Sequence, residues 1–294
     1  MERHNVTKKV GILGIVANLF LFAIKIAIGF IGHSWAMIAD AVNSAGDIFA
    51  SLMTWIGNKI ASVPNDEDHN YGHGKAEYIF SMIISLSMIL VSLKMLYDSI
   101  ISIVIGNKLI FSWMLVVVCS ITILVKFCLF LYTRYLYSKC NNVLVKANML
   151  DHRNDCIITV FTLIAILLTK VNIFWLDGVV GIGISIWIFR TGVEIFKDSY
   201  HVLMDSSIDK DSKKKILNII KNNNDIKRIG HLYSIPIGYK YIVVITVFID
   251  GKMTTVKSHK IVDKIEEKIL SKLDNVEQVL IHVEPYFEEK EKNN

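Results

Sequence analysis

Six long apolar segments constrain this chain more than any other feature of its sequence. They run from Val10 to Gly32, Trp35 to Ala61, Glu77 to Ile105, Phe111 to Leu136, Leu144 to Lys170 and Trp175 to Tyr200. A helix of about 20 apolar residues crosses the hydrocarbon core of a bilayer, so these segments are long enough to span a membrane. Hydrophobic residues make up 53% of the chain, which argues against an ordinary pair of soluble domains. The sequence therefore predicts an α-helical membrane protein with six transmembrane helices.

Basic residues gather at one end of the predicted bundle, before the first segment and around the junction of the fourth and fifth. They are Arg3, Lys8, Lys9, Arg134, Lys139 and Lys146. Because Lys and Arg resist translocation, we expect a multi-pass protein of the cell (plasma) membrane with both termini in the cytoplasm. The net charge of +5 follows from this topology and from a lysine-rich tail, so it does not indicate a nucleic-acid partner.

The composition changes after Tyr200, where a polar stretch rich in Lys and Asn precedes shorter apolar segments. Apolar residues have helical spacing over 208–220 and 256–273, and they alternate as in strands over 226–235, 239–249 and 276–283. The order helix, strand, strand, helix, strand is typical of a small ferredoxin-like α/β domain that is well suited to dimerising. We therefore expect a transmembrane domain over residues 1–204 and a cytoplasmic α/β domain over residues 205–294.

Two of the predicted membrane helices carry oxygen-bearing side chains at a repeated spacing. Asn43 and Asp47 stand four residues apart in the second segment, and Asp151 and Asp155 do so in the fifth. Residues four apart lie on one face of a helix, so two facing helices would bring four oxygen donors together. Acidic side chains inside a membrane cost several kcal/mol unless they have partners, which makes them functional candidates.

A structural alternative is that these side chains pair with basic residues or hydroxyl groups and hold the helices together. The basic candidates are Lys25, Lys94, Lys126 and Arg153. Structural pairing does not require the repeated four-residue spacing, so the spacing favours a metal site. His152 and Arg153 are expected on other faces of their helix, and Arg153 has no assigned role.

The loop between the second and third segments holds another cluster of candidate ligands. Asp66, His69 and His73 follow one another closely, and glycines on both sides of His73 permit a tight turn. Carboxylate and imidazole groups are common metal ligands in proteins. The sequence predicts a loop metal site here, with a solvated polar loop as the alternative.

Taken together, these motifs resemble the cation diffusion facilitator family over nearly the whole chain. The similar stretches are the second-segment pair followed by 48–51, the loop 64–77, the Asp-His-Arg-Asn-Asp run 151–155, the run 203–205 and the run 281–285. The resemblance implies a homodimer with six transmembrane helices and a metallochaperone-like cytoplasmic domain. It also implies export of a divalent metal ion in exchange for protons. It places the transport site on Asn43, Asp47, Asp151 and Asp155, and the loop site on Asp66, His69 and His73.

The resemblance extends to residues outside these two sites. It implies cytoplasmic metal ligands at His231, His259, His282 and Glu284, with simple surface residues at the dimer seam as the alternative. Thr246 stands where zinc-exporting relatives usually have His, which puts their two-metal arrangement in doubt. Lys75 and Asp205 match a family ion pair that would tie the loop to the base of the sixth helix.

The donor set indicates which ion the transport site prefers. An amide oxygen and three carboxylates form a hard set that suits Mn²⁺ and, on donor type alone, Mg²⁺ or Ca²⁺. The Asn43 and Asp47 pair with the Asp151 and Asp155 pair resembles the manganese-exporting branch of the family. Zn²⁺, Fe²⁺ and Co²⁺ stay open, because affinity generally rises along the divalent series. Metal and protons should compete for the carboxylates, as an antiporter requires.

Other classes of function fit the sequence less well. A membrane-anchored metal sensor would not need intramembrane carboxylates, and the tail resembles no kinase, cyclase or DNA-reading element. The sequence contains no HExxH or GxSxG motif, so we do not expect an enzyme or a catalytic cofactor. We predict a divalent metal transporter.

Overall fold

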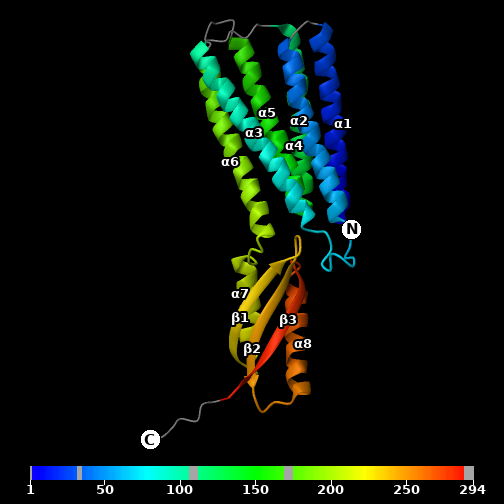
Figure 1. Ribbon diagram of the computed structural model, residues 1–294, viewed down its shortest axis with the longest axis vertical. Helices are drawn as coiled ribbons and strands as arrows, with labels where there is room; N and C mark the ends of the chain where they lie inside the picture. The colour runs from blue at the N-terminus through cyan, green and yellow to red at the C-terminus, as the bar shows by residue number, and fades with distance from the viewer. Residues whose placement is uncertain (1, 32–34, 106–111, 169–174, 288–294) are drawn as a thin grey trace.

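The computed structural model describes residues 2–31, 35–105, 112–168 and 175–287. Figure 1 shows a long bundle of helices above a small domain of strands and helices. The bundle helices are α1 (Glu2–Ile31), α2 (Trp35–Ala61), α3 (Ala76–Ile105), α4 (Trp113–Cys140), α5 (Val143–Leu168) and α6 (Trp175–Leu203). The six predicted membrane helices are therefore present, each close to its expected range.

The bundle helices fall into two kinds. Within the described residues, α1, α3, α4 and α6 combine a membrane-spanning length with a strongly apolar composition. Large apolar side chains on their outer faces are exposed, as contact with lipid requires; Leu90 and Leu124 expose 67% and 65% of their surface. Helices α2 and α5 are equally long but carry the polar side chains of the predicted transport site. The chain is a multi-pass membrane protein.

Close packing of α1 against α2 positions one end of the predicted site. A Cβ atom added to Gly11 would lie only 3.0 Å from the backbone nitrogen of Trp55, so glycine lets the two helices approach. Further along, the Asn18 side chain donates hydrogen bonds to the backbone oxygen of Asp47 and to Ser51 Oγ, each at 3.2 Å. Helix α1 therefore holds the turn of α2 that carries Asp47.

The C-terminal domain has the predicted order of elements. They are α7 (Lys210–Lys221), β1 (Ile226–Pro236), β2 (Tyr241–Asp250), α8 (Thr255–Lys272) and β3 (Val276–Tyr286). The middle strand β2 is antiparallel to β1 and parallel to β3, and α8 makes the crossover that a parallel pair needs. Isoleucines and valines of the helices and strands, including Ile216, Ile245 and Ile269, form the core. The predicted small α/β domain is confirmed.

The turn between β1 and β2 points at the lower end of the bundle (Figure 1). There the backbones of Gly74 and Gly238 approach each other, and a Cβ on Gly74 would lie 3.2 Å from Gly238 Cα. The φ angle of Gly238 is 102°, which glycine adopts without strain. The Arg3 guanidinium also lies 4.1 Å from the centre of the Tyr239 ring. The start of α1 and the α/β domain therefore lie at the same end of the bundle.

Candidate metal sites

Three of the four predicted transport residues line one cavity inside the bundle. Asp47 from α2 and Asp151 and Asp155 from α5 border a cavity of about 270 Å³, whose described lining comes from α2, α3, α5 and α6. The apolar part of that lining includes Met88. Asn43 lies on α2 one turn before Asp47, and its side chain is outside the described part of the structure. The two helices that the spacing singled out therefore do present their carboxylates to a common space.

A lysine from α4 holds two of these carboxylates together. Lys126 Nζ lies 2.6 Å from Asp47 Oδ2 and 2.6 Å from Asp155 Oδ2, so it donates a hydrogen bond to each. Lys126 is only 1% exposed, and buried charges are tolerated only when they are paired. The sequence offered Lys126 as one of several structural partners and could not show that it reaches both helices.

A buried histidine lies beside the carboxylates of α5. Each of three residues offers one possible ligand atom here, and the three atoms lie within 4.8 Å of one another; the residues are Asp151, His152 and Asp155. His152 is fully buried, and neither ring nitrogen has a hydrogen-bond partner among the described residues; the same is true of Asp151 Oδ2. Helical spacing had assigned His152 to another face, but its position next to Asp151 brings a nitrogen donor within reach of the site.

Arg153, which had no assigned role, connects α5 to α6. Its guanidinium lies 4.6 Å from the centre of the Trp187 ring, and Nη2 donates to Thr191 Oγ1 at 3.3 Å. Lys25 of α1 donates to Ser44 Oγ of α2 at 2.9 Å. Both basic residues therefore link neighbouring helices through hydroxyl or ring contacts, and among the described residues neither forms an ion pair with the three carboxylates.

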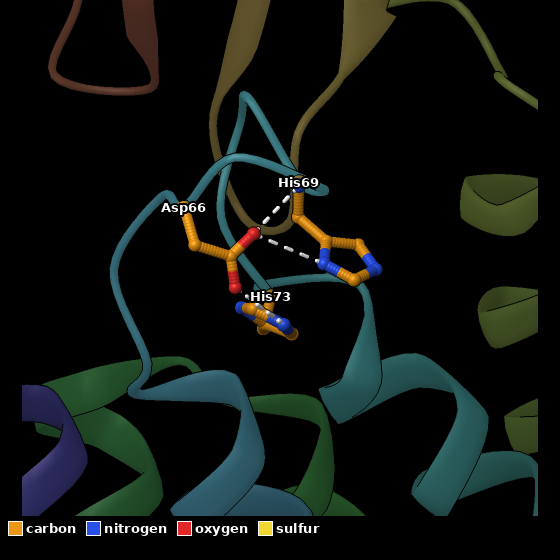
Figure 2. Close-up of side chains that lie close together, drawn as sticks. All are labelled: Asp66, His69 and His73. Atoms are coloured by element: carbon orange, nitrogen blue, oxygen red, sulfur yellow. Dashed lines mark hydrogen bonds and ion pairs between the residues drawn. The ribbon is translucent and has the colours of Figure 1, made fainter.

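The loop after α2 brings the three predicted loop ligands together (Figure 2). Asp66 Oδ1 accepts a hydrogen bond from the His69 backbone nitrogen at 2.6 Å and lies 3.2 Å from His69 Nδ1, while Asp66 Oδ2 lies 3.6 Å from His73 Nε2. One ligand atom from each residue lies within 4.8 Å of the others. The His69 backbone N–H holds the pKa of Asp66 below its usual value, so the carboxylate is ionised at neutral pH. A cation could be held by these three side chains.

The cytoplasmic candidates do not form one cluster within a single chain. His282 and Glu284 are neighbours on β3, with 2.9 Å between Nε2 and Oε1. His259 on α8 instead lies 3.3 Å from Asp263, and His231 is an exposed residue of β1. Among the described residues, no group of three ligands includes any of these four side chains.

Two sets of contacts lie at the lower end of the bundle. Lys75 Nζ lies 2.8 Å from Asp205 Oδ1, the pair that the resemblance implied. The second set was not foreseen from the sequence: the Arg3 guanidinium lies 2.9 and 2.8 Å from the two carboxylate oxygens of Glu77, which also accepts a hydrogen bond from Asn142. The only hint in the sequence was an acidic residue at the start of an apolar helix. The ends of α1 and α3 and the turn before α5 are thereby tied together.

Comparison with known proteins places this architecture in a family. The family model described as the cation efflux transmembrane domain matches residues 11–204, and the one described as the cytoplasmic domain of cation efflux proteins matches residues 208–286. The chain belongs to the cation efflux family. The resemblance to cation diffusion facilitators is therefore confirmed, and the protein is a divalent metal cation efflux transporter, not an enzyme.

Relatives of this cation efflux protein match it over almost its full length. The manganese efflux system protein MneP of Bacillus subtilis is 30% identical and is matched over 98% of this chain and 99% of its own length. MneS, a second manganese efflux system protein of the same organism, is 31% identical over 97% and 99%. The magnetosome protein MamM of Magnetospirillum gryphiswaldense is 26% identical over 95% and 88%.

Proposed function

We propose that this protein exports Mn²⁺ in exchange for protons through Asn43, Asp47, Asp151 and Asp155. The observation that carries the proposal is the convergence of three carboxylates from two membrane helices on one cavity. An oxygen donor set suits a hard divalent ion such as Mn²⁺. Two relatives of about this length bear the name manganese efflux system protein, at 30% and 31% identity, which supports the choice of ion.

Proton exchange follows from the need to balance charge in a membrane interior. Lys126 supplies one positive charge next to Asp47 and Asp155, and a bound divalent ion would supply two more. When the metal ion leaves, protons are the cations available to replace it, so metal and protons compete for the same carboxylates. Exposure of the site to each side of the membrane in turn would then couple metal efflux to proton entry.

The remaining parts of the chain have supporting roles in this proposal. We place the protein in the plasma membrane as a homodimer with both termini cytoplasmic, and residues 205–294 form its dimerising and regulatory domain. Asp66, His69 and His73 form an accessory metal site. His282 and Glu284 are the better-placed pair of the four cytoplasmic candidates, since their side chains are in contact. The ion pair of Lys75 and Asp205 keeps the loop and the base of α6 together.

A second candidate is an exporter of Zn²⁺, Fe²⁺ or Co²⁺ with the same fold. The observation in its favour is His152, whose buried ring lies beside Asp151 and Asp155 and could add a nitrogen ligand of the kind that zinc prefers. Replacing His152 with Ala separates the two candidates, because a manganese site built from oxygen donors would keep its order of ion preference. Under the second candidate, the same substitution would weaken Zn²⁺ transport most.

The proposed function is tested by metal efflux from vesicles. The purified protein is reconstituted in liposomes, and transport of Mn²⁺, Zn²⁺, Fe²⁺ and Co²⁺ is measured with and without a pH gradient. We expect Mn²⁺ to be transported fastest and a reversed gradient to slow its movement. If the rate of Mn²⁺ transport is the same when the pH gradient is reversed and when it is collapsed, proton exchange is eliminated. If Zn²⁺ is transported faster than Mn²⁺, manganese is eliminated as the preferred ion.

A further inference from the structure

The unforeseen lysine of the site suggests how the site recognises the charge of its ion. We propose that Lys126 is a fixed cation of the transport site, which stays beside Asp47 and Asp155 while the metal ion is bound. In this role it sets the net charge of the site to the value that one divalent ion neutralises. The inference deepens the proposed function and rests on it, since it requires the three carboxylates to be metal ligands.

The geometry leaves room for both cations at once. Lys126 Nζ contacts one oxygen, Oδ2, of Asp47 and one oxygen, Oδ2, of Asp155, so the Oδ1 atom of each carboxylate is left for another ligand. The described residues that line the cavity come from α2, α3, α5 and α6, whereas Lys126 belongs to α4. The ammonium therefore reaches the carboxylates from α4, and an ion in the cavity can bind them from the opposite side.

The burial of Lys126 explains why it would remain in place. Its side chain is 2% exposed, and moving its ammonium away from both carboxylates would leave an unpaired charge inside the bundle. Removing the partner of a buried charge is strongly unfavourable. Lys94 also lines the cavity, but it forms no ion pair with these carboxylates among the described residues. Lys25 of α1 is buried as well, but it donates to Ser44 Oγ, whereas Lys126 contacts Asp47 and Asp155 directly.

The summed charge of these residues determines the ion charge that the site can balance. With the metal ion bound, the three carboxylates and the one ammonium in direct contact with them carry two net negative charges, which a divalent ion balances. With the ammonium removed, the same site would carry three negative charges and would suit a trivalent ion. Charge matching is decisive here because the interaction between charges grows as the surroundings become less polar. Lys126 is therefore a specificity-determining residue for the charge of the ion.

The test is to change the charge of Lys126 and measure the ratio of Gd³⁺ affinity to Mn²⁺ affinity by calorimetry on the full-length protein. A background carrying Asp66→Ala and His73→Ala removes the loop ligands. Lys126→Gln keeps a hydrogen-bond donor but loses the charge, and we expect the ratio to rise at least about tenfold. Lys126→Arg, which keeps the charge, should leave the ratio unchanged.

A compensating substitution distinguishes charge from a structural role. Adding Asp151→Asn to Lys126→Gln restores two net negative charges and should return the ratio toward the wild-type value, which a merely structural link would not do. If Lys126→Gln does not fold alone, the double variant is compared with Asp151→Asn, because the two differ only in the charge of Lys126 and the ratio should be higher in the double variant. A ratio unchanged by these substitutions would overturn the inference. Mn²⁺ binding that survives Asp155→Ala would overturn the proposed transport site as well.

Discussion

The two ion pairs of Lys126 predict that loss of both carboxylates costs more than the sum of the single losses. In Asp47→Asn or Asp155→Asn, the ammonium keeps one carboxylate at 2.6 Å, and repulsion between the two acids is relieved. We expect each single substitution to reduce the free energy of unfolding by about 1 kcal/mol, the usual contribution of one hydrogen bond. In the double variant a buried ammonium loses both of its paired carboxylates, and the expected loss is about 3–5 kcal/mol.

The assay is thermal unfolding of the purified protein in detergent with a chelator present, so that metal binding does not contribute. A loss of 1 kcal/mol corresponds to roughly 2–4 °C in Tm for a domain of this size, so the single and double variants are easily separated. Asp98→Asn, the same substitution at an exposed position of α3, is the matched control and should leave Tm unchanged. A double variant no less stable than the sum of the singles would show that Lys126 does not hold both carboxylates.

Three further predictions concern the other candidate residues. Asn43→His should shift the order of transported ions toward Zn²⁺, because it replaces an oxygen donor with nitrogen; an unchanged order would contradict the argument from donor type. His73→Ala should abolish metal binding by the loop in equilibrium dialysis but leave Mn²⁺ transport measurable, and loss of all transport would mean that the loop ion is essential. Lys75→Asp should change the free energy of unfolding by less than about 1 kcal/mol, since the pair with Asp205 is exposed. The same substitution should nevertheless slow transport. Combining it with Asp205→Lys, which reverses the pair, should restore the transport rate.

The fold could be predicted from the sequence because its strongest patterns are local. Six apolar segments of membrane-spanning length and one change of composition after Tyr200 were enough to place the helices and the α/β domain. The candidate transport residues were also accessible, since a spacing of four residues fixes a common face on any helix. Asp47, Asp151 and Asp155 needed only the further assumption that α2 and α5 face each other.

The contacts that could not be predicted all depend on how the helices pack. A lysine in an apolar helix can turn toward any neighbour, so the sequence does not reveal that Lys126 reaches α2 and α5 together. Helical spacing placed His152 on another face, and only the packed structure shows a ring nitrogen within 4.8 Å of ligand atoms of Asp151 and Asp155. Arg3 and Glu77 are distant in the sequence, and their side chains meet only because the N-terminal ends of α1 and α3 come together at one end of the bundle.

The central claim is that the carboxylates of α2 and α5 carry the metal ion across the membrane. It is tested most directly by Mn²⁺ efflux from proteoliposomes containing Asp47→Ala or Asp155→Ala, with Asp98→Ala as the matched control and with insertion and dimer formation verified for each variant. We expect no Mn²⁺ efflux from the first two variants and a wild-type rate from the control. Mn²⁺ efflux at the wild-type rate after either substitution in α2 or α5 would contradict it.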